Sequence, residues 1–140
     1  MKIIVINGAN LNMLGVREVE IYGKRTYADL VGYIKSEAKK RGLKVKIVQS
    51  NYEGKLVEYI QKAYKKYDGI IINAGAYTHT SIAVRDALSA VGLPVAEVHL
   101  SDISSREEFR RNSYVSDVAK KVIIGKGFEG YKEALDYFAG

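Results

Sequence analysis

The two histidines of the chain both lie close to apolar runs in which β-strands are expected. His79 follows the run at residues 69–73, and His99 lies inside the run at residues 94–101. Imidazole is the side chain that most readily exchanges a proton near neutral pH. Either histidine alone is as well explained by a structural role, so a catalytic interpretation depends on the residues around them.

His99 has an acidic neighbour at the spacing of a shared strand face. Glu97, His99 and Ser101 are two residues apart, so a strand would point all three to one side of its sheet. A glutamate in a central strand is rarely buried without a partner. A carboxylate beside an imidazole fixes the ring tautomer and stabilises its charged form. We therefore predict that Glu97 orients His99; the alternative is an edge strand on which Glu97 faces water.

Five apolar runs alternate with helical patterns and supply the strands that would position these residues. Residues 2–7 form a nearly continuous apolar run, typical of a strand covered on both faces, whereas Leu43, Val45 and Ile47 alternate with lysines as in an outer strand. The other runs cover residues 69–73, 94–101 and 118–125. This alternation predicts a single α/β domain over residues 1–140, with a five-stranded, doubly wound parallel sheet.

Capping residues and apolar stripes indicate the helices. Thr26 and Asp29 have the spacing of a capping box, and Gly42 is expected to end the helix that they begin. The expected helices cover residues 26–42, 56–67, 83–91, a short stretch from Ser104 or Ser105, and residues 131–138.

The segment at residues 8–25 interrupts this alternation because it shows no clear periodicity. It joins the first strand to its helix and is longer than the usual connection in such folds. The segment carries Arg17 and Tyr22, with Gly15 and Gly23 near its polar residues. We predict that it forms a lid over a binding site.

Polar residues gather where four of the five strands end. Ligands of open parallel sheets bind beyond the carboxyl ends of the strands. Asparagine, serine and glycine also form turns and helix caps, but that role does not account for the two histidines. The residues at these ends include Asn7, Asn10, Ser50, Asn51, Asn73, His79, His99 and Ser101.

Composition excludes several classes of protein. The chain has 140 residues, of which 47% are hydrophobic and 27% charged, and it lacks cysteine, so disulfide and thiolate chemistry are excluded. The apolar run at residues 3–6 is too short for a signal peptide or a membrane span, so we expect a cytoplasmic protein without a membrane partner. The net charge of +6 favours an anionic partner, but its basic residues are dispersed, and we expect no nucleic-acid partner and no metal.

A glycine pattern near the C-terminus matches a dinucleotide-binding motif. Gly125, Gly127 and Gly130 have the spacing G-x-G-x-x-G between a strand and a helix. The pattern follows the last strand, however, and no strand with an acidic residue comes after it. A tight turn into the last helix is the preferred interpretation, and a non-catalytic small-ligand or nucleotide-binding module remains the alternative function.

Five segments, in this order, are together similar to a known family. They read NGANLNMLGVREVEIYG (7–23), QSNYEG (49–54), NAGAYTHTSIAVRDAL (73–88), EVHLSD with REEFR (97–110) and GKGFEGY (125–131). On these segments the chain resembles type II 3-dehydroquinate dehydratase from Asn7 to the last helix. The resemblance implies a flavodoxin-like fold and a hydro-lyase of the shikimate pathway that dehydrates 3-dehydroquinate to 3-dehydroshikimate without a Schiff base. It also implies no cofactor and a homododecamer built as four trimers.

The resemblance also implies roles for individual residues. Tyr22 falls on the catalytic base, Arg17 on the essential lid arginine and Asn10 on a residue that stabilises the enolate. His99 falls on the general acid, with Glu97 as its partner. Substrate contacts fall on Asn73, His79, Leu100, Ser101 and Arg110, and Asp86 falls on a residue that reaches a neighbouring subunit's site.

Four positions depart from the family pattern. Ala9 and Val19 stand where prolines are common, which predicts a looser lid. Asp102 replaces a commoner asparagine and Arg111 a frequent histidine. The carboxylate of Asp102 would weaken anion binding unless Arg110 or Arg111 compensates for its charge.

Overall fold

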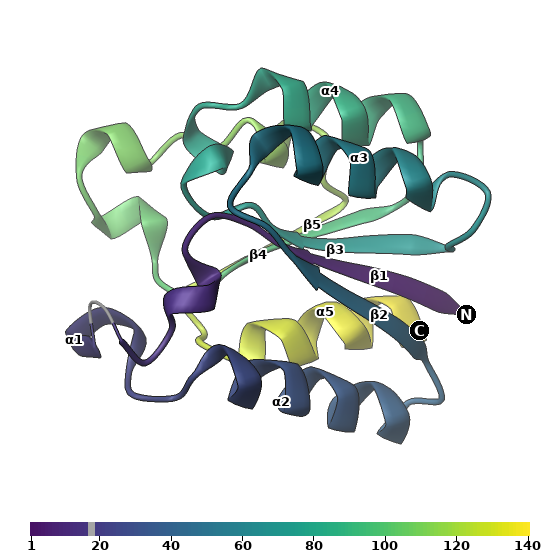
Figure 1. The fold of residues 1–140 in the computed structure, drawn as a ribbon, viewed down its shortest axis with the longest axis horizontal. Coiled ribbons are helices and arrows are strands. Elements are labelled where there is room, and N and C mark those ends of the chain that lie inside the picture. Colours follow the sequence, from purple (N-terminus) through teal and green to yellow (C-terminus); the bar gives the residue numbers. More distant parts are fainter. Residues whose placement is uncertain (17–18) are drawn as a thin grey trace.

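The computed structural model describes residues 1–16 and 19–140, and for Ile21 and Tyr22 it describes the backbone alone. Five parallel strands form one sheet in the order β2-β1-β3-β4-β5, with helices on both faces (Figure 1). The strands are β1 (Lys2–Asn7), β2 (Lys44–Gln49), β3 (Gly69–Asn73), β4 (Val95–His99) and β5 (Lys121–Ile124). The predicted single-domain, doubly wound α/β fold is therefore confirmed, with β2 as an outer strand.

Alternate residues of β1 face opposite layers of the fold. Ile3 and Val5 belong to one buried core and Ile4 and Ile6 to the other, because successive side chains of a strand point to opposite faces. The helices are α2 (Tyr27–Lys40) and α5 (Glu129–Ala139) on the first face, and α3 (Glu53–Ala63) and α4 (Ile82–Val91) on the second. Two covered faces explain why β1 reads as a nearly unbroken apolar run.

The predicted capping box at the start of α2 is present. The Thr26 hydroxyl accepts a hydrogen bond from the Asp29 N–H, and the Asp29 carboxylate accepts one from the Thr26 N–H. The helix ends at Lys40, and Gly42 follows in the left-handed region at φ 67°. Both ends of α2 are thus set by local residue chemistry.

The short fourth helix predicted from Ser104 or Ser105 is not an α-helix. The segment forms two separate 3₁₀ turns, Ile103–Ser105 and Glu108–Arg110. The Asp102 carboxylate accepts hydrogen bonds from the N–H and the hydroxyl of Ser104, which caps a single turn, and Arg106 then adopts an extended backbone. The run predicted at 118–125 is also shorter as a strand, because a further 3₁₀ turn at Val115–Asp117 precedes it.

The connection between β1 and α2 contains more regular structure than its sequence indicates. A 3₁₀ turn covers Leu11–Met13, and the short helix α1 covers Val19–Tyr22. Leu11 and Leu14 are buried in the core beside α2 and α5, so the first part of the segment is packed onto the domain. The lid role of residues 8–25 stays a prediction.

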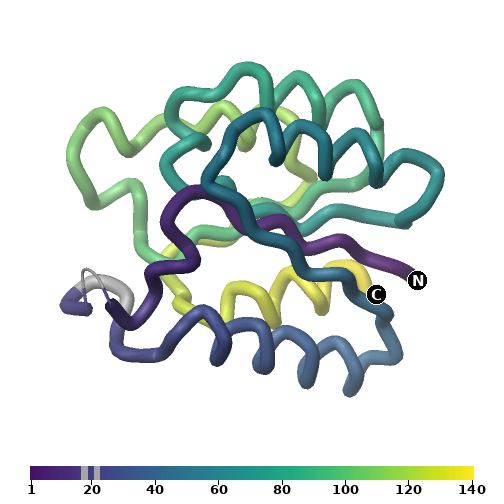
Figure 2. Tube along the Cα trace, viewed as in Figure 1, coloured from purple at the N-terminus to yellow at the C-terminus, as the bar shows by residue number. Residues whose placement is uncertain are grey.

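The carboxyl ends of the strands lie on the side of the domain where the chain makes its longest connections, after β1 and after β4 (Figure 2). Across residues 1–16 and 19–140, none of the helices is both long and apolar enough to cross a membrane. The polar strand ends therefore have long segments around them from which a site can be built.

A buried hydrogen bond connects α5 to the end of β1 and gives a prediction about stability. Tyr131 is fully buried and its hydroxyl donates to Asn7 Oδ1 at 2.6 Å, while burial raises the pKa of this phenol and keeps it neutral. Tyr131→Phe leaves that oxygen without its donor and is expected to lower the free energy of unfolding by about 1–3 kcal/mol. Tyr137→Phe, at an exposed position of the same helix, should change it by less than about 0.5 kcal/mol. Urea unfolding of the two variants at one protein concentration measures the difference, and equal unfolding curves would contradict the prediction.

Candidate active site

A pocket opens at the carboxyl ends of the central strands, where the polar rim was predicted. Its walls come from the segments after β1 and β3, from the end of β4 and from the two 3₁₀ turns that follow β4. Seven of the predicted site residues line it: Asn10, Asn73, His79, His99, Leu100, Ser101 and Arg110. The strand-end rule thus brings together residues that lie up to a hundred positions apart.

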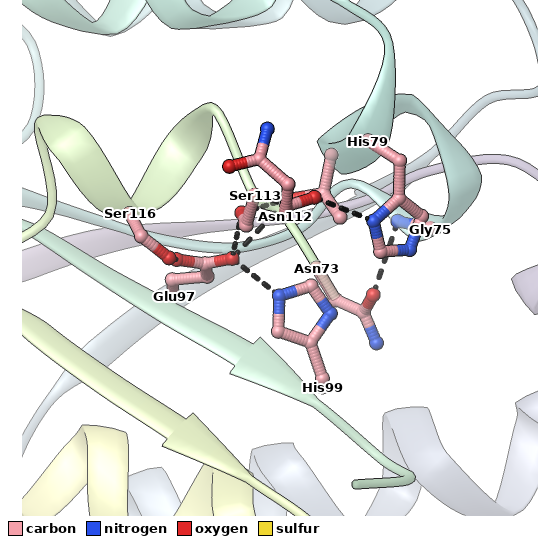
Figure 3. Close-up of polar contacts among 9 residues, drawn as sticks. Asn73, Gly75, His79, Glu97, His99, Asn112, Ser113 and Ser116 are labelled. Atoms are coloured by element: carbon pink, nitrogen blue, oxygen red, sulfur yellow. Dashed lines mark hydrogen bonds and ion pairs between the residues drawn. The ribbon is translucent and has the colours of Figure 1, made fainter. Parts of the chain in front are cut away.

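Glu97 and His99 form a buried pair, of which His99 lines this pocket. β4 lies between β3 and β5, so the alternative of a water-exposed edge strand for Glu97 is wrong. Glu97 is fully buried, and its Oε2 lies within hydrogen-bonding distance of Nε2 of His99 (Figure 3). Burial alone raises the pKa of a carboxyl, but the hydrogen bond and charge of His99, with two serine hydroxyls, hold the pKa of Glu97 below its ordinary value.

Three hydroxyl groups surround the Glu97 carboxylate, and the sequence analysis identified none of them. Ser113 donates to Oε2 and Ser116 to Oε1, each at 2.5 Å. Thr78 lies 3.2 Å from Oε2 and within hydrogen-bonding distance of Ser113. Ser113 and Ser116 come from the segment between β4 and β5, in the part that lies between the predicted short helix and the predicted strand. The sequence signal for further polar partners was Glu97 itself, because a single histidine cannot satisfy all the hydrogen-bond acceptor positions of a buried carboxylate.

His79 lies on the opposite wall, at the end of the 3₁₀ turn Gly75–His79 after β3. Its Nδ1 is 2.8 Å from the carbonyl oxygen of Asn112. Burial lowers the pKa of His79, and the nearby His99 and Arg110 charges act in the same direction. Both histidines therefore face one pocket, but each is held by a different kind of acceptor.

The turns after β1 and β3 approach each other closely at two glycines. A Cβ atom on Gly8 would lie 2.2 Å from the carbonyl oxygen of Ala74, and one on Gly75 would lie 2.6 Å from that of Ala9. Gly75 also has a positive φ of 64° and donates its N–H to Asn73 Oδ1. This contact brings the Asn10 and Asn73 turns together at the pocket.

Asn10 has a backbone conformation that is uncommon for a residue with a side chain. It lies in the left-handed region at φ 70° and ψ 0°. Its N–H donates to Asn51 Oδ1 at 2.9 Å, and Gln49 Nε2 donates to the same oxygen at 3.1 Å. The polar end of β2, predicted as part of the rim, therefore holds the turn that carries Asn10.

Two arginines make one wall of the pocket positive. Nε of Arg110 is buried and lies 2.9 Å from a Glu107 oxygen, although this contact lacks hydrogen-bond geometry. Arg106 lines the same wall with its side chain 14% exposed. Guanidinium groups suit a carboxylate ligand because they present several donors in one plane. Arg106 was not among the predicted site residues, although it stands four residues before Arg110 in the REEFR segment.

The glycine-rich turn after β5 contacts the backbone of the segment that carries pocket residues at the end of β4. The Gly125 N–H lies within hydrogen-bonding distance of the carbonyl oxygens of His99 and Ser101, and the Gly127 N–H donates to Leu100. These donors are occupied by backbone acceptors, so they are not presented to a phosphate group. The preferred interpretation of this motif as a structural turn agrees with these contacts.

Besides the buried Glu97, which is not among the pocket-lining residues, three predicted site residues are not placed in the pocket. Asp86 is exposed on α4 and pairs with Arg85 at 3.0 Å, away from the pocket-lining residues. Arg17 lies outside the described residues, and so does the side chain of Tyr22, whose backbone ends α1. Their proposed roles therefore depend on the family and on experiment.

Comparison with known proteins identifies the family of this chain. The family model of class II dehydroquinases matches residues 1–139. A 3-dehydroquinate dehydratase of Clostridium acetobutylicum is 53% identical over 131 residues, which is 94% of this chain and 91% of that protein. One from Actinobacillus pleuropneumoniae serotype 5b is 51% identical over 136 residues, or 97% of this chain and 88% of that protein.

Solved structures give the same result. The type II dehydroquinase of Butyrivibrio crossotus superposes with a TM-score of 0.98 at 47% identity, covering 100% of this chain and 98% of that one. The type II dehydroquinase of Propionibacterium acnes gives a TM-score of 0.95 at 39% identity, covering 99% and 95%. The resemblance predicted from the sequence segments is confirmed, and this chain belongs to the class II dehydroquinase family.

Proposed function

We propose that this chain is a 3-dehydroquinate dehydratase, a hydro-lyase that converts 3-dehydroquinate to 3-dehydroshikimate through an enolate and without a Schiff base. Family membership and the names of its relatives support the reaction. The observation that carries the proposal is the buried Glu97–His99 pair, whose His99 lines a pocket with Arg106 and Arg110 on its wall.

Loss of water β to a ketone sets three chemical requirements. A base removes the α-proton, donors stabilise the enolate oxygen, and an acid protonates the departing hydroxyl so that it leaves as water. The electron pair of the broken C–H bond passes into the enolate and then forms the new C=C bond. A buried imidazole with a carboxylate partner suits the acid, and two guanidinium groups suit the carboxylate of the substrate.

Tyr22 is the proposed base and Arg17 the cation that activates it. A free tyrosine has a pKa of about 10, so only about 0.1% is phenolate at pH 7. An adjacent cation can lower such a pKa by about 1–3 units, and two units raise the phenolate fraction roughly a hundredfold. Arginine suits this role because its guanidinium stays charged in almost any environment.

The remaining roles follow the family positions and are part of the proposal. Asn10 stabilises the enolate, and His99 protonates the leaving hydroxyl while Glu97 balances its charge. Arg110 binds the substrate carboxylate, with further contacts from Asn73, His79, Leu100 and Ser101. The exposed Asp86 would act on the site of a neighbouring subunit in a homododecamer. That assembly, a cytoplasmic location and the absence of a cofactor stay predictions.

The direct test of this function is to mix purified protein with 3-dehydroquinate and follow the ultraviolet absorbance of the conjugated enone product. Steady formation of product supports the proposal. Borohydride added during turnover should leave the activity intact, because no lysine imine forms. Absence of product, or inactivation by borohydride, would contradict the proposed reaction or its mechanism. A coloured or nucleotide-loaded purified protein would instead favour the alternative binding module.

Tyr22→Phe tests the proposed base. The variant keeps the ring but lacks the hydroxyl, so kcat should fall by at least about a hundredfold while substrate affinity changes little. Affinity is measured by calorimetric titration and kcat by the absorbance assay. Tyr64→Phe, at an exposed tyrosine in the turn after α3, is the matched control and should keep full activity. Turnover by Tyr22→Phe close to that of the original protein would rule out Tyr22 as the base.

Arg17→Ala tests whether the guanidinium acts on the phenol. If Arg17 lowers the pKa of Tyr22, its removal raises that pKa, and the lost kcat should recover in part as the pH rises towards 10. The measurement is the pH profile of kcat for the variant against that of the original protein. A parallel loss of kcat at every pH would show that Arg17 closes the lid or binds substrate instead.

A further inference from the structure

One short segment, residues 112–116, helps to hold both histidines of the pocket. It contacts His79 directly and His99 through Glu97. The carbonyl oxygen of Asn112 lies against His79, and the hydroxyls of Ser113 and Ser116 hold Glu97, which in turn binds His99 (Figure 3). The segment joins the turn at Glu108–Arg110 to β5 and was assigned no role by its sequence. Its contacts differ for the two rings, and this difference determines where each ring carries its proton.

For His79 the acceptor is a backbone carbonyl. A carbonyl oxygen only accepts hydrogen bonds, so the proton of this contact is on Nδ1 of His79. Burial lowers the pKa of His79 below its ordinary value and so favours the neutral ring. A neutral ring with its proton on Nδ1 presents Nε2 as an acceptor.

For His99 the acceptor is a carboxylate that already accepts hydrogen bonds from two serine hydroxyls. Ser116 donates to Oε1 and Ser113 to Oε2, and these bonds favour the ionised form of Glu97. An ionised carboxylate only accepts, so the proton of the third contact is on Nε2 of His99. Nδ1 of His99 then points towards Asn73 and the His79 side of the pocket (Figure 3).

We propose that residues 112–116 hold the two histidines in opposite tautomers, with Ser113 and Ser116 as positioning residues that keep Glu97 an acceptor for His99. In the resting protein His79 carries its proton on Nδ1 and His99 carries it on Nε2. Among the residues that the structure describes, the charged and titratable groups of this cluster and its pocket are the two histidines, Glu97, Arg106, and Arg110 on the turn at Glu108–Arg110.

The consequence for catalysis rests on the proposed function, whereas the tautomers themselves do not. Nε2 of His79 can accept a hydrogen bond from a substrate hydroxyl. Nδ1 of His99 can take up a proton from solvent water, with Glu97 stabilising the charge of the ring, and then deliver that proton to the leaving hydroxyl, which departs as water. The pocket would thus contain two imidazole side chains with different roles: His79 as a hydrogen-bond acceptor and His99 as an acid.

The test is a ¹H–¹⁵N multiple-bond correlation spectrum of the resting protein labelled with [¹⁵N]histidine, at neutral to mildly alkaline pH. The chain has only two histidines, so two ring patterns are expected. One should be that of an Nδ1–H ring and the other that of an Nε2–H ring. Two rings with the same tautomer would overturn the proposal, whatever the activity of the protein.

The double variant Ser113→Ala/Ser116→Ala tests the positioning role. The His99 pattern should lose its single Nε2–H form, kcat should fall by about tenfold or more, and KM should change little. The His79 pattern should be unchanged, because its acceptor is a backbone atom, and it reports that the local fold is intact. Ser116→Thr keeps a hydroxyl and should therefore keep most of the kcat that Ser116→Ala loses, while Ser36→Ala, at an exposed position of α2, is the neutral control.

The outcomes separate this inference from the proposed function. Opposite tautomers in a protein without dehydratase activity would contradict the function and keep the inference. An active protein whose double variant keeps both the His99 pattern and kcat would contradict the inference alone. If the double variant also disturbs His79, Ser116→Ala alone decides, since Ser116 is only half-buried and its loss should still change His99.

Discussion

A charged carboxylate buried inside a parallel sheet is costly, and the arrangement around Glu97 reduces that cost. An unpaired charge in such a place would be neutralised by a proton. Glu97 instead accepts hydrogen bonds from His99, Ser113 and Ser116. These groups come from β4 and from the segment before β5, so the placement of the charge depends on the tertiary fold.

The same constraint explains several features that have no catalytic role of their own. β4 must be an interior strand for Glu97 to be buried, and the turn at Gly125 and Gly127 holds the carbonyls that follow Glu97 on that strand. The 3₁₀ turns between β4 and β5 replace a regular helix and allow Arg106 and Arg110 to line the pocket. Strand β4 and the turns around it therefore position the few charged side chains at the pocket.

Much of this arrangement could be predicted from the sequence, because strand periodicity is set by neighbouring residues and the strand-end rule follows once the sheet is expected to be parallel. The parity of Glu97 and His99 predicted their pairing, and the capping box at Thr26 predicted the start of α2. The partners Thr78, Ser113 and Ser116 could not be predicted, since isolated hydroxyl residues have no periodic signal and meet Glu97 only in the folded chain. The helix expected near Ser104 was wrong because side-chain capping by Asp102 competed with helix propagation. The roles of Arg17 and Tyr22 came from the family resemblance, and they stay predictions.

The most direct test of this account is kcat and KM for Glu97→Gln, measured beside circular dichroism of the variant. Glutamine keeps the shape of the side chain but removes the charge that stabilises protonated His99. The account predicts a folded protein whose kcat is about 10- to 100-fold lower, with KM little changed, as expected for the loss of a charge-assisted hydrogen bond. A folded variant with the original kcat would contradict the central place given to the Glu97–His99 pair.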